Sequence, residues 1–341
     1  MDLSDQAEEA VPLELTATEI ERFKEDGYLC IRQAFSPEKA FNCRNAIWNA
    51  MMQDGISPMD PMTWPRRKSI GHVYSAADGV PWSDVISKRL IKGIDTICGE
   101  DRWCKPLGLG WWTVGFPGYF ADSPWDVDGQ WHVDGSNVHY PFNKEIGLTA
   151  IMLFSDVHDN IHGATTALKG SHKYISGVIA EAGFRGLSGY QIKKVLNECE
   201  GDWEAEQLCG LAGDVFLMHP LLVHARSRNV GQFGDISAVR FVCHPTIPLK
   251  EHMNFCGKDL TPLEQSIFDS VPLTDGYNPL YFITPSNVAE FAENRKKRED
   301  ESGEQVGRKR KQGRVGHSGD GEGGEEEHPP HGEDSIRSYI S

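Results

Sequence analysis

The chain has 341 residues, of which 39% are hydrophobic and 25% charged, and this composition supports a packed core with a solvated surface. Its 34 basic and 50 acidic residues give a net charge of −16, which disfavours nucleic-acid binding because that needs a positive face against phosphates. No apolar run approaches the ~18 residues of a membrane span, and no signal peptide opens the sequence. We therefore expect a cytoplasmic protein without a membrane contact.

The eight cysteines are scattered along the chain, with no CxxC pair and no spacing typical of zinc ligands. Such cysteines are typical of reduced thiols that pack in a core. The pattern argues against an all-cysteine metal site.

The expected elements begin with two helices around a short strand. Thr16 and Glu19 form a capping-box pattern, which predicts a helix that ends near Gly27. The apolar run 28–35 predicts a strand, and Ser36-Pro37 predicts the start of a second helix.

From about residue 109 the chain is typical of strands separated by Gly and Asp turns. The expected strands are 109–116, 130–135, 147–157, 213–227 and 236–245. No βαβ alternation and no glycine-rich phosphate loop is present. The simplest architecture is an antiparallel β core with helical cover, mainly β with flanking α.

The last fifty residues differ from the rest in composition. A terminal helix over 286–300 leads into a charged, low-complexity segment that lacks large apolar residues, so we expect one domain over 1–291 and a disordered tail over 292–341. The basic clusters 295–298 and 308–311 fit either a solvated tail or a nuclear-import signal.

His132 and Asp134 are the first candidate metal ligands. Residues i and i+2 of a strand project from one face, so this H-x-D pair supplies two of the three ligands of a 2-His-1-carboxylate site. Alone the pattern is weak evidence. About ninety residues downstream lie His219 and His224, five apart, so only one of them could face the metal from a continuous strand. Pro220 favours a strand end or a structural role for His219.

Arg240 is the candidate anion ligand. It lies between apolar residues in the strand 236–245, and an inward guanidinium there requires an anionic partner such as a dicarboxylate. Arg226 shares the strand face of His224 and could compete for this role. His244, four residues after Arg240, shares the face of Arg240.

These motifs together resemble the phytanoyl-CoA dioxygenase family of Fe(II)- and 2-oxoglutarate-dependent oxygenases. The resemblance covers roughly residues 14–285 in order. It rests on LTATEIERFKEDGYLCIRQAFSPEKA, WHVDG, HGATTALKGSHK and GDVFLMHPLLVHARSRN. It implies a double-stranded β-helix, a cupin-like jelly roll, with N-terminal helices.

By this resemblance His132, Asp134 and His224 fall on the iron ligands, and Arg240 falls on the arginine that binds the distal carboxylate of 2-oxoglutarate. Thr149 lies where a small hydroxyl residue can assist that carboxylate. Two departures leave Arg226 open as an alternative to Arg240: the loop before Arg240 is longer than usual, and Arg226 replaces a small residue.

The implied function is oxidation of a C–H bond of a small molecule by O2, with Fe(II) and 2-oxoglutarate and release of succinate and CO2. Because relatives that halogenate replace the carboxylate ligand by a small residue, Asp134 favours hydroxylation, or a related desaturation or ring closure. Two alternatives stay open. One is a nuclear oxygenase of protein or nucleic acid, and the other is a catalytically silent binding protein on this fold. The substrate and the oligomeric state are not predicted.

Overall fold

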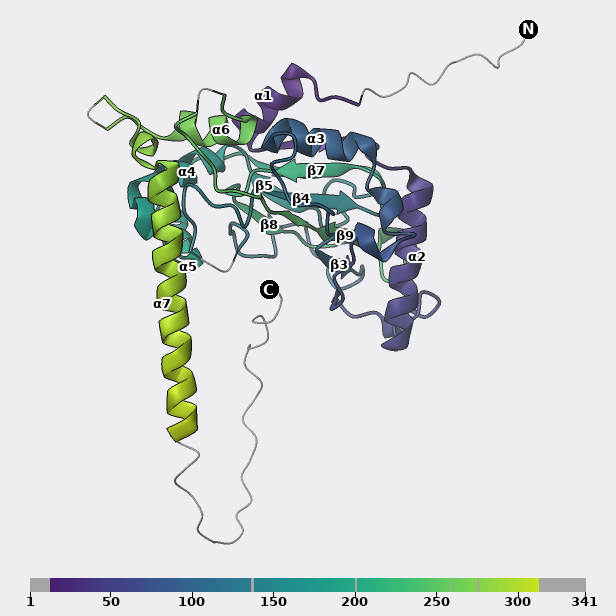
Figure 1. Ribbon diagram of the computed structural model, residues 1–341. Coiled ribbons are helices and arrows are strands. Elements are labelled where there is room, and N and C mark those ends of the chain that lie inside the picture. The colour runs from purple at the N-terminus through teal and green to yellow at the C-terminus, as the bar shows by residue number, and fades with distance from the viewer. Residues whose placement is uncertain (1–12, 136–137, 200, 258, 275, 313–341) are drawn as a thin grey trace, which may run out of the picture. The chain divides into compact units, whose positions relative to one another are not determined.

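The structure is a computed structural model that describes residues 13–135, 138–199, 201–257, 259–274 and 276–312, without the side chains of 299–312 (Figure 1). Contacts divide the chain into two units, Met1–Ala289 and Glu290–Ser341. Every candidate site residue belongs to the first unit.

Helices and strands alternate irregularly along the chain, and the strands lie mostly in its middle and later parts. The α-helices are α1 (Ala17–Asp26), α2 (Pro37–Gln53), α3 (Lys88–Cys98), α4 (Ser171–Ala182), α5 (Gly189–Glu198), α6 (Pro262–Ser270) and α7 (Pro285–Gln312). The strands are β1 (Tyr28–Ile31), β2 (Arg67–Ile70), β3 (Trp111–Gly115), β4 (Leu148–Leu153), β5 (Thr165–Leu168), β6 (Ala205–Gln207), β7 (Val215–Met218), β8 (His224–Arg226), β9 (Arg240–His244) and β10 (Thr246–Ile247).

The structure confirms the predicted first helix, with its capping box and its end before Gly27. The backbone amide of Glu19 donates to Thr16 Oγ1 at 3.2 Å, while the Thr16 amide donates to the Glu19 carboxylate at 2.7 Å. The helix ends at Gly27, whose φ of 87° is a left-handed conformation that glycine adopts without a Cβ penalty. This turn leads directly into β1.

Two antiparallel sheets form the β core. The large sheet has the order β1-β7-β4-β9-β3-β2, with β10 paired to β4, and the small sheet has the order β6-β5-β8. One buried apolar cluster joins the inner faces of both, with Ile151 and Leu153 of β4 and Val242 of β9 opposite Ala167 of β5. The expected fold class, a double-stranded β-helix with flanking helices, is confirmed.

Helices cover the outer face of the large sheet (Figure 1). Trp48 of α2 packs edge-on against Phe241 of β9, with ring centroids 5.4 Å apart. Because side chains alternate along a strand, Phe241 and Cys243 face the helices while Arg240, Val242 and His244 face the second sheet. This alternation positions the candidate arginine inside the fold.

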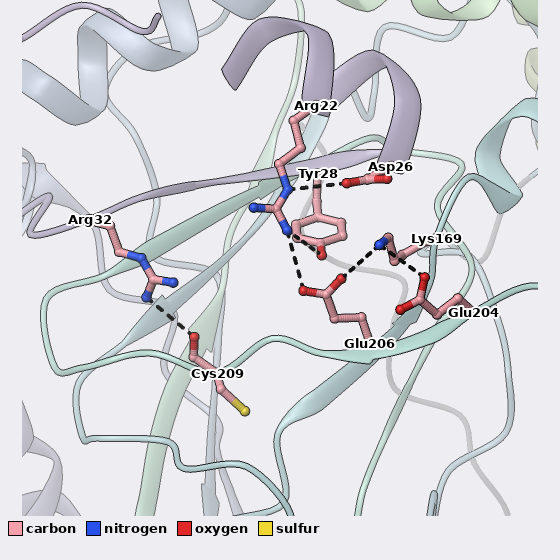
Figure 2. Close-up of polar contacts among 8 residues, drawn as sticks. All are labelled: Arg22, Asp26, Tyr28, Arg32, Lys169, Glu204, Glu206 and Cys209. Carbon is pink, nitrogen blue, oxygen red and sulfur yellow. Dashed lines mark hydrogen bonds and ion pairs between the residues drawn. The ribbon is translucent and has the colours of Figure 1, made fainter. Parts of the chain in front are cut away.

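A polar network connects α1 and β1 to the small sheet (Figure 2). Arg22 lies 3.2 Å from Asp26 and 3.4 Å from Glu206 of β6, and it donates to the hydroxyl of Tyr28. Lys169 pairs with Glu206 from the other side at 3.4 Å. Because these charged side chains are partly exposed to solvent, each pair contributes less than about 1 kcal/mol to stability.

Two expected strands differ from the structure. The segment 213–227 forms two strands, β7 in the large sheet and β8 in the small one, because the chain turns at His219-Pro220 and crosses between the sheets. The segment 130–135 contributes one isolated bridge, His132 to His224, rather than a full strand. Both changes bring the H-x-D pair beside β8.

The terminal helix is longer than expected, since α7 continues to Gln312 rather than ending near residue 300. Residues 292–312 lie in this helix, which their Ala, Glu, Lys, Arg and Gln favour, while the domain boundary at 291 stays a prediction. Residues 313–341 lie outside the described residues. No helix among the described ones is both long and apolar enough to span a membrane.

Candidate metal centre

The backbone places the two candidate histidines side by side. His132 and His224 exchange two hydrogen bonds: the His132 amide donates to the His224 carbonyl at 3.0 Å, and the His224 amide donates to the His132 carbonyl at 2.9 Å. Directly opposed residues point to the same face. The imidazole rings consequently lie 4.5 Å apart, although 92 residues separate them in the chain.

Asp134 completes a cluster with the two imidazoles. Its Oδ1 lies 3.5 Å from His224 Nε2 and 3.8 Å from His132 Nε2, and one donor atom from each residue lies within 4.8 Å of the others. With bonds of about 2.1 Å, an octahedral ion places neighbouring donors about 3 Å apart. Closure by less than about 2 Å would suit these donors to one ion.

Each imidazole is held with Nε2 toward the cluster. His132 Nδ1 lies 2.8 Å from the Gln130 carbonyl, and His224 Nδ1 lies 3.0 Å from the Leu222 carbonyl. A carbonyl oxygen can only accept, so Nδ1 carries the proton and Nε2 keeps a lone pair. Metal-binding histidines commonly show this arrangement.

Charge in the cluster favours a cation. Burial alone raises the pKa of Asp134, but contact with His224 and the charges of His244 and His132 lower this pKa overall. Burial lowers the pKa of His224, and the Asp134 carboxylate more than offsets that effect. The His132 side chain remains 52% exposed, so solvent and ligands reach the cluster from its side.

Arg240 lies between the sheets at the start of β9 and is 7% exposed. Its Nη2 donates to Thr165 Oγ1 of β5 at 3.0 Å, while its Nε has no hydrogen-bond partner. Burial, together with the nearby charge of Arg67, lowers the pKa of Arg240 to about 10. A buried guanidinium with no described carboxylate partner is the ordinary signature of a site for an anionic ligand.

The alternative arginine is engaged elsewhere. Arg226 donates from Nε to the Asp128 carboxylate at 3.3 Å, and its side chain is 42% exposed. Asp128 also pairs with Arg66. This geometry favours Arg240 over Arg226 as the anion ligand.

Thr149 is not brought to Arg240. Thr149 is buried in β4 opposite Thr246, which is six residues beyond Arg240, and at ~3.3 Å per residue this is up to about 20 Å along the strand direction. The hydroxyl beside Arg240 belongs to Thr165. Thr165 lies in the motif HGATTALKGSHK, but only the pairing of β5 with β8 reveals its inward direction.

His244 is a further inward residue at the opposite end of β9 from Arg240. Burial, followed by the charge of Arg240, lowers the pKa of His244 to about 3, and the three clustered residues also contribute to this pKa. His244 therefore lies near both Arg240 and the His132–Asp134–His224 cluster. His219, by contrast, is buried against Phe23 and His172, away from the cluster.

Two imidazoles and one carboxylate with open positions on a β-sandwich define the class of protein: a non-haem iron oxygenase. The family model described as phytanoyl-CoA dioxygenase (PhyH) matches residues 23–234, which is more than half of the chain. This chain belongs to the phytanoyl-CoA dioxygenase family. It is accordingly a 2-oxoglutarate-dependent dioxygenase that uses iron. The match includes all three clustered residues and ends before Arg240.

Solved structures that are similar to this chain include the following three. HygX from Streptomyces hygroscopicus, with nickel and 2-oxoglutarate bound, is 17% identical at a TM-score of 0.43 and covers 70% of this chain and 88% of its own. EctD from S. alaskensis with bound Fe is 16% identical at a TM-score of 0.45, covering 69% and 76%. SnoK, a non-heme alpha ketoglutarate dependent carbocyclase from nogalamycin biosynthesis, is 18% identical at 0.40, covering 69% and 84%. Among curated proteins, none matches this sequence significantly.

Proposed function

We propose that this dioxygenase hydroxylates a C–H bond of a small molecule, with iron held by His132, Asp134 and His224 and the distal carboxylate of 2-oxoglutarate bound by Arg240. The convergence of those three donors on one point carries the proposal. These three donors would hold the metal as a 2-His-1-carboxylate set, which leaves room for a keto acid and O2. When bound, iron and 2-oxoglutarate supply the oxidation of the C–H bond, with release of succinate and CO2.

The residues of the chain bind and orient the reactants. The carbonyls of Gln130 and Leu222 fix the protons on Nδ1 of the two histidines, so both Nε2 atoms stay available. Arg240 and Thr165 offer hydrogen-bond donors to an anion between the sheets. Thr165 lies two positions before Ala167, the partner of His224, a span of about 7 Å along β5. That span suits a five-carbon dicarboxylate that reaches from the metal to Arg240.

The carboxylate of Asp134 supports hydroxylation over halogenation, because halogenation requires a metal position that a bound carboxylate fills. The complete donor set also argues against a silent binding protein. The basic cluster 295–298 is exposed on α7, while the side chains of 308–311 lie outside the described part of the chain. Nuclear residence stays a prediction.

The test is a titration of the full chain with Fe(II) and then 2-oxoglutarate under anaerobic conditions, followed by a succinate-release screen of candidate metabolites. We expect one Fe(II) per chain and a weak visible charge-transfer band after 2-oxoglutarate is added. In His132→Ala and Asp134→Ala, iron affinity should fall more than about 100-fold, because losing a direct ligand exceeds the 10–100-fold effect of losing an outer partner. His158→Ala, an exposed histidine outside the cluster, is the control. Wild-type iron binding in either ligand variant would refute the assignment.

A further inference from the structure

His244 is the last residue of β9, and its imidazole faces the space between the two sheets. Val242, two residues earlier, belongs to the buried cluster between the sheets. Because alternate side chains of a strand share a face, His244 and Arg240 point the same way as Val242. The backbone thus places an imidazole on the wall that also carries Arg240.

The groups around this imidazole come from both sheets. Arg240 lies on its own strand, and the charges of Asp134, His224 and His132, which lie at or beside β8 of the small sheet, also act on it. His244 is not one of the residues whose donor atoms cluster within 4.8 Å of one another. It therefore lies beside the candidate metal position without being a ligand.

The His244 imidazole has no hydrogen-bond partner among the described residues, whereas His132, His224 and His252 each contact a backbone carbonyl. An imidazole ring always carries at least one N–H that can donate a hydrogen bond. The ring is partly buried, and neither nitrogen is among the fully buried polar atoms that lack a partner. A ligand that enters this space can therefore reach the imidazole and pair with it.

The position of His244 on β9 indicates which ligand the imidazole contacts. His244 and Arg240 are four residues apart, about 13 Å along β9, and the Arg240 side chain covers part of this distance. A dicarboxylate held by Arg240 at one end has its other end near the clustered donors, beside His244. The group presented there by 2-oxoglutarate is the keto acid end, whose carboxylate accepts hydrogen bonds.

We propose that the imidazole of His244 donates a hydrogen bond to the C1 carboxylate of 2-oxoglutarate and so orients the keto acid at the metal. This rests on the proposed function. His244 is then a positioning residue for the co-substrate. Arg240 and Thr165 hold one end of 2-oxoglutarate, and His244 holds the other end against the wall formed by β9.

The experiment measures the dissociation constant of 2-oxoglutarate for the Fe(II)-loaded full chain under argon, in wild type and two variants. His244→Leu removes the donor, and His244→Gln keeps an N–H donor. We expect about 10-fold weaker binding in His244→Leu, because a hydrogen bond to a carboxylate typically contributes a factor of this size or more. We expect near wild-type binding in His244→Gln. The exposed His72→Leu is the matched control.

Two further readouts separate positioning from a structural role. The Fe(II) affinity without 2-oxoglutarate should be unchanged in both His244 variants, and the charge-transfer maximum should shift in His244→Leu but not in His244→Gln. Equal 2-oxoglutarate affinity in all variants, or joint loss of Fe(II) binding in both, would overturn the proposal. Wild type that binds Fe(II) but not 2-oxoglutarate would instead refute the proposed function, and this inference with it.

Discussion

The side chains of the two candidate histidine ligands are fixed to different degrees by their surroundings. His224 is buried in β8, so its ring is fixed by packing as well as by the Leu222 carbonyl. His132 is half exposed and depends on the Gln130 carbonyl and on the bridge to His224. The open side of the cluster is therefore the side of His132, and reactants are expected to approach from there.

Substitution of Arg240 and substitution of Arg226 are expected to have different effects on 2-oxoglutarate binding. Arg240→Gln should raise the dissociation constant of 2-oxoglutarate at least about 10-fold, since a charge-assisted bond to its distal carboxylate is lost, while Fe(II) binding stays intact. Arg226→Gln should leave both unchanged, because Arg226 is paired with Asp128 at the surface.

The measurement includes 2-oxopentanoate, which has the keto acid but lacks the distal carboxylate. Arg240→Gln should not weaken this second ligand, so the difference between the two ligands isolates the carboxylate contact. A loss of 2-oxoglutarate affinity in Arg226→Gln alone would move the role to Arg226.

The pairing register between strands determines which residues face the site. β3 pairs with β9 so that Trp111 opposes His244 and Gly115 opposes Arg240. Gly110 lies just before β3 with φ of 61°, and a Cβ there would lie 2.1 Å from the His244 carbonyl oxygen. Only glycine permits this close approach.

Gly110→Ala should therefore lower the free energy of unfolding by at least about 2 kcal/mol, because a left-handed alanine costs about 1 kcal/mol and the backbone clash adds to it. The 2-oxoglutarate affinity should fall as well, since the end of β9 must move. Denaturant unfolding and ligand titration measure the two effects. Gly108→Ala is the control, because a Cβ there meets nothing within 4 Å. Equal effects of the two changes would show that the contact is unimportant.

Local sequence signals predict much of the fold, but features that depend on strand pairing cannot be predicted from them. The Thr16 capping box and the turn at Gly27 are encoded by neighbouring residues, and the structure confirms them. The inward direction of Thr165 depends on the pairing of β5 with β8, and the distance of Thr149 from Arg240 depends on the pairing of β4 with β10. A single sequence carries neither pairing, so it does not show which hydroxyl lies beside Arg240.

Across the whole molecule, α6 is joined to the loop after α3 by an ion pair in which Glu264 is buried and Arg102 is partly exposed. Both carboxylate oxygens of Glu264 accept from Arg102, at 2.6 and 2.9 Å, and Glu264 also accepts from the backbone amides of Asn254 and Thr261. Burial raises the pKa of Glu264, but these donors lower it overall. The contact thereby links the segment after α3, before the central strands, to α6, which follows the last strand.

Because the pKa of Glu264 is lower in the folded state, the pair contributes stability above the unfolded pKa of about 4.5, and that stability is lost as the pH falls through the folded pKa. Glu264→Gln should lower the free energy of unfolding by about 2 to 4 kcal/mol at pH 7, since Arg102 loses its partner, while glutamine preserves the capping box. The difference from wild type should start to shrink below the unfolded pKa of about 4.5 and disappear as the pH falls through the lower folded pKa of Glu264, where the wild-type side chain also becomes neutral. Urea unfolding at several pH values measures this, with the exposed Glu204→Gln as control. A difference that stayed constant with pH would show that the charge of Glu264 does not stabilise the fold.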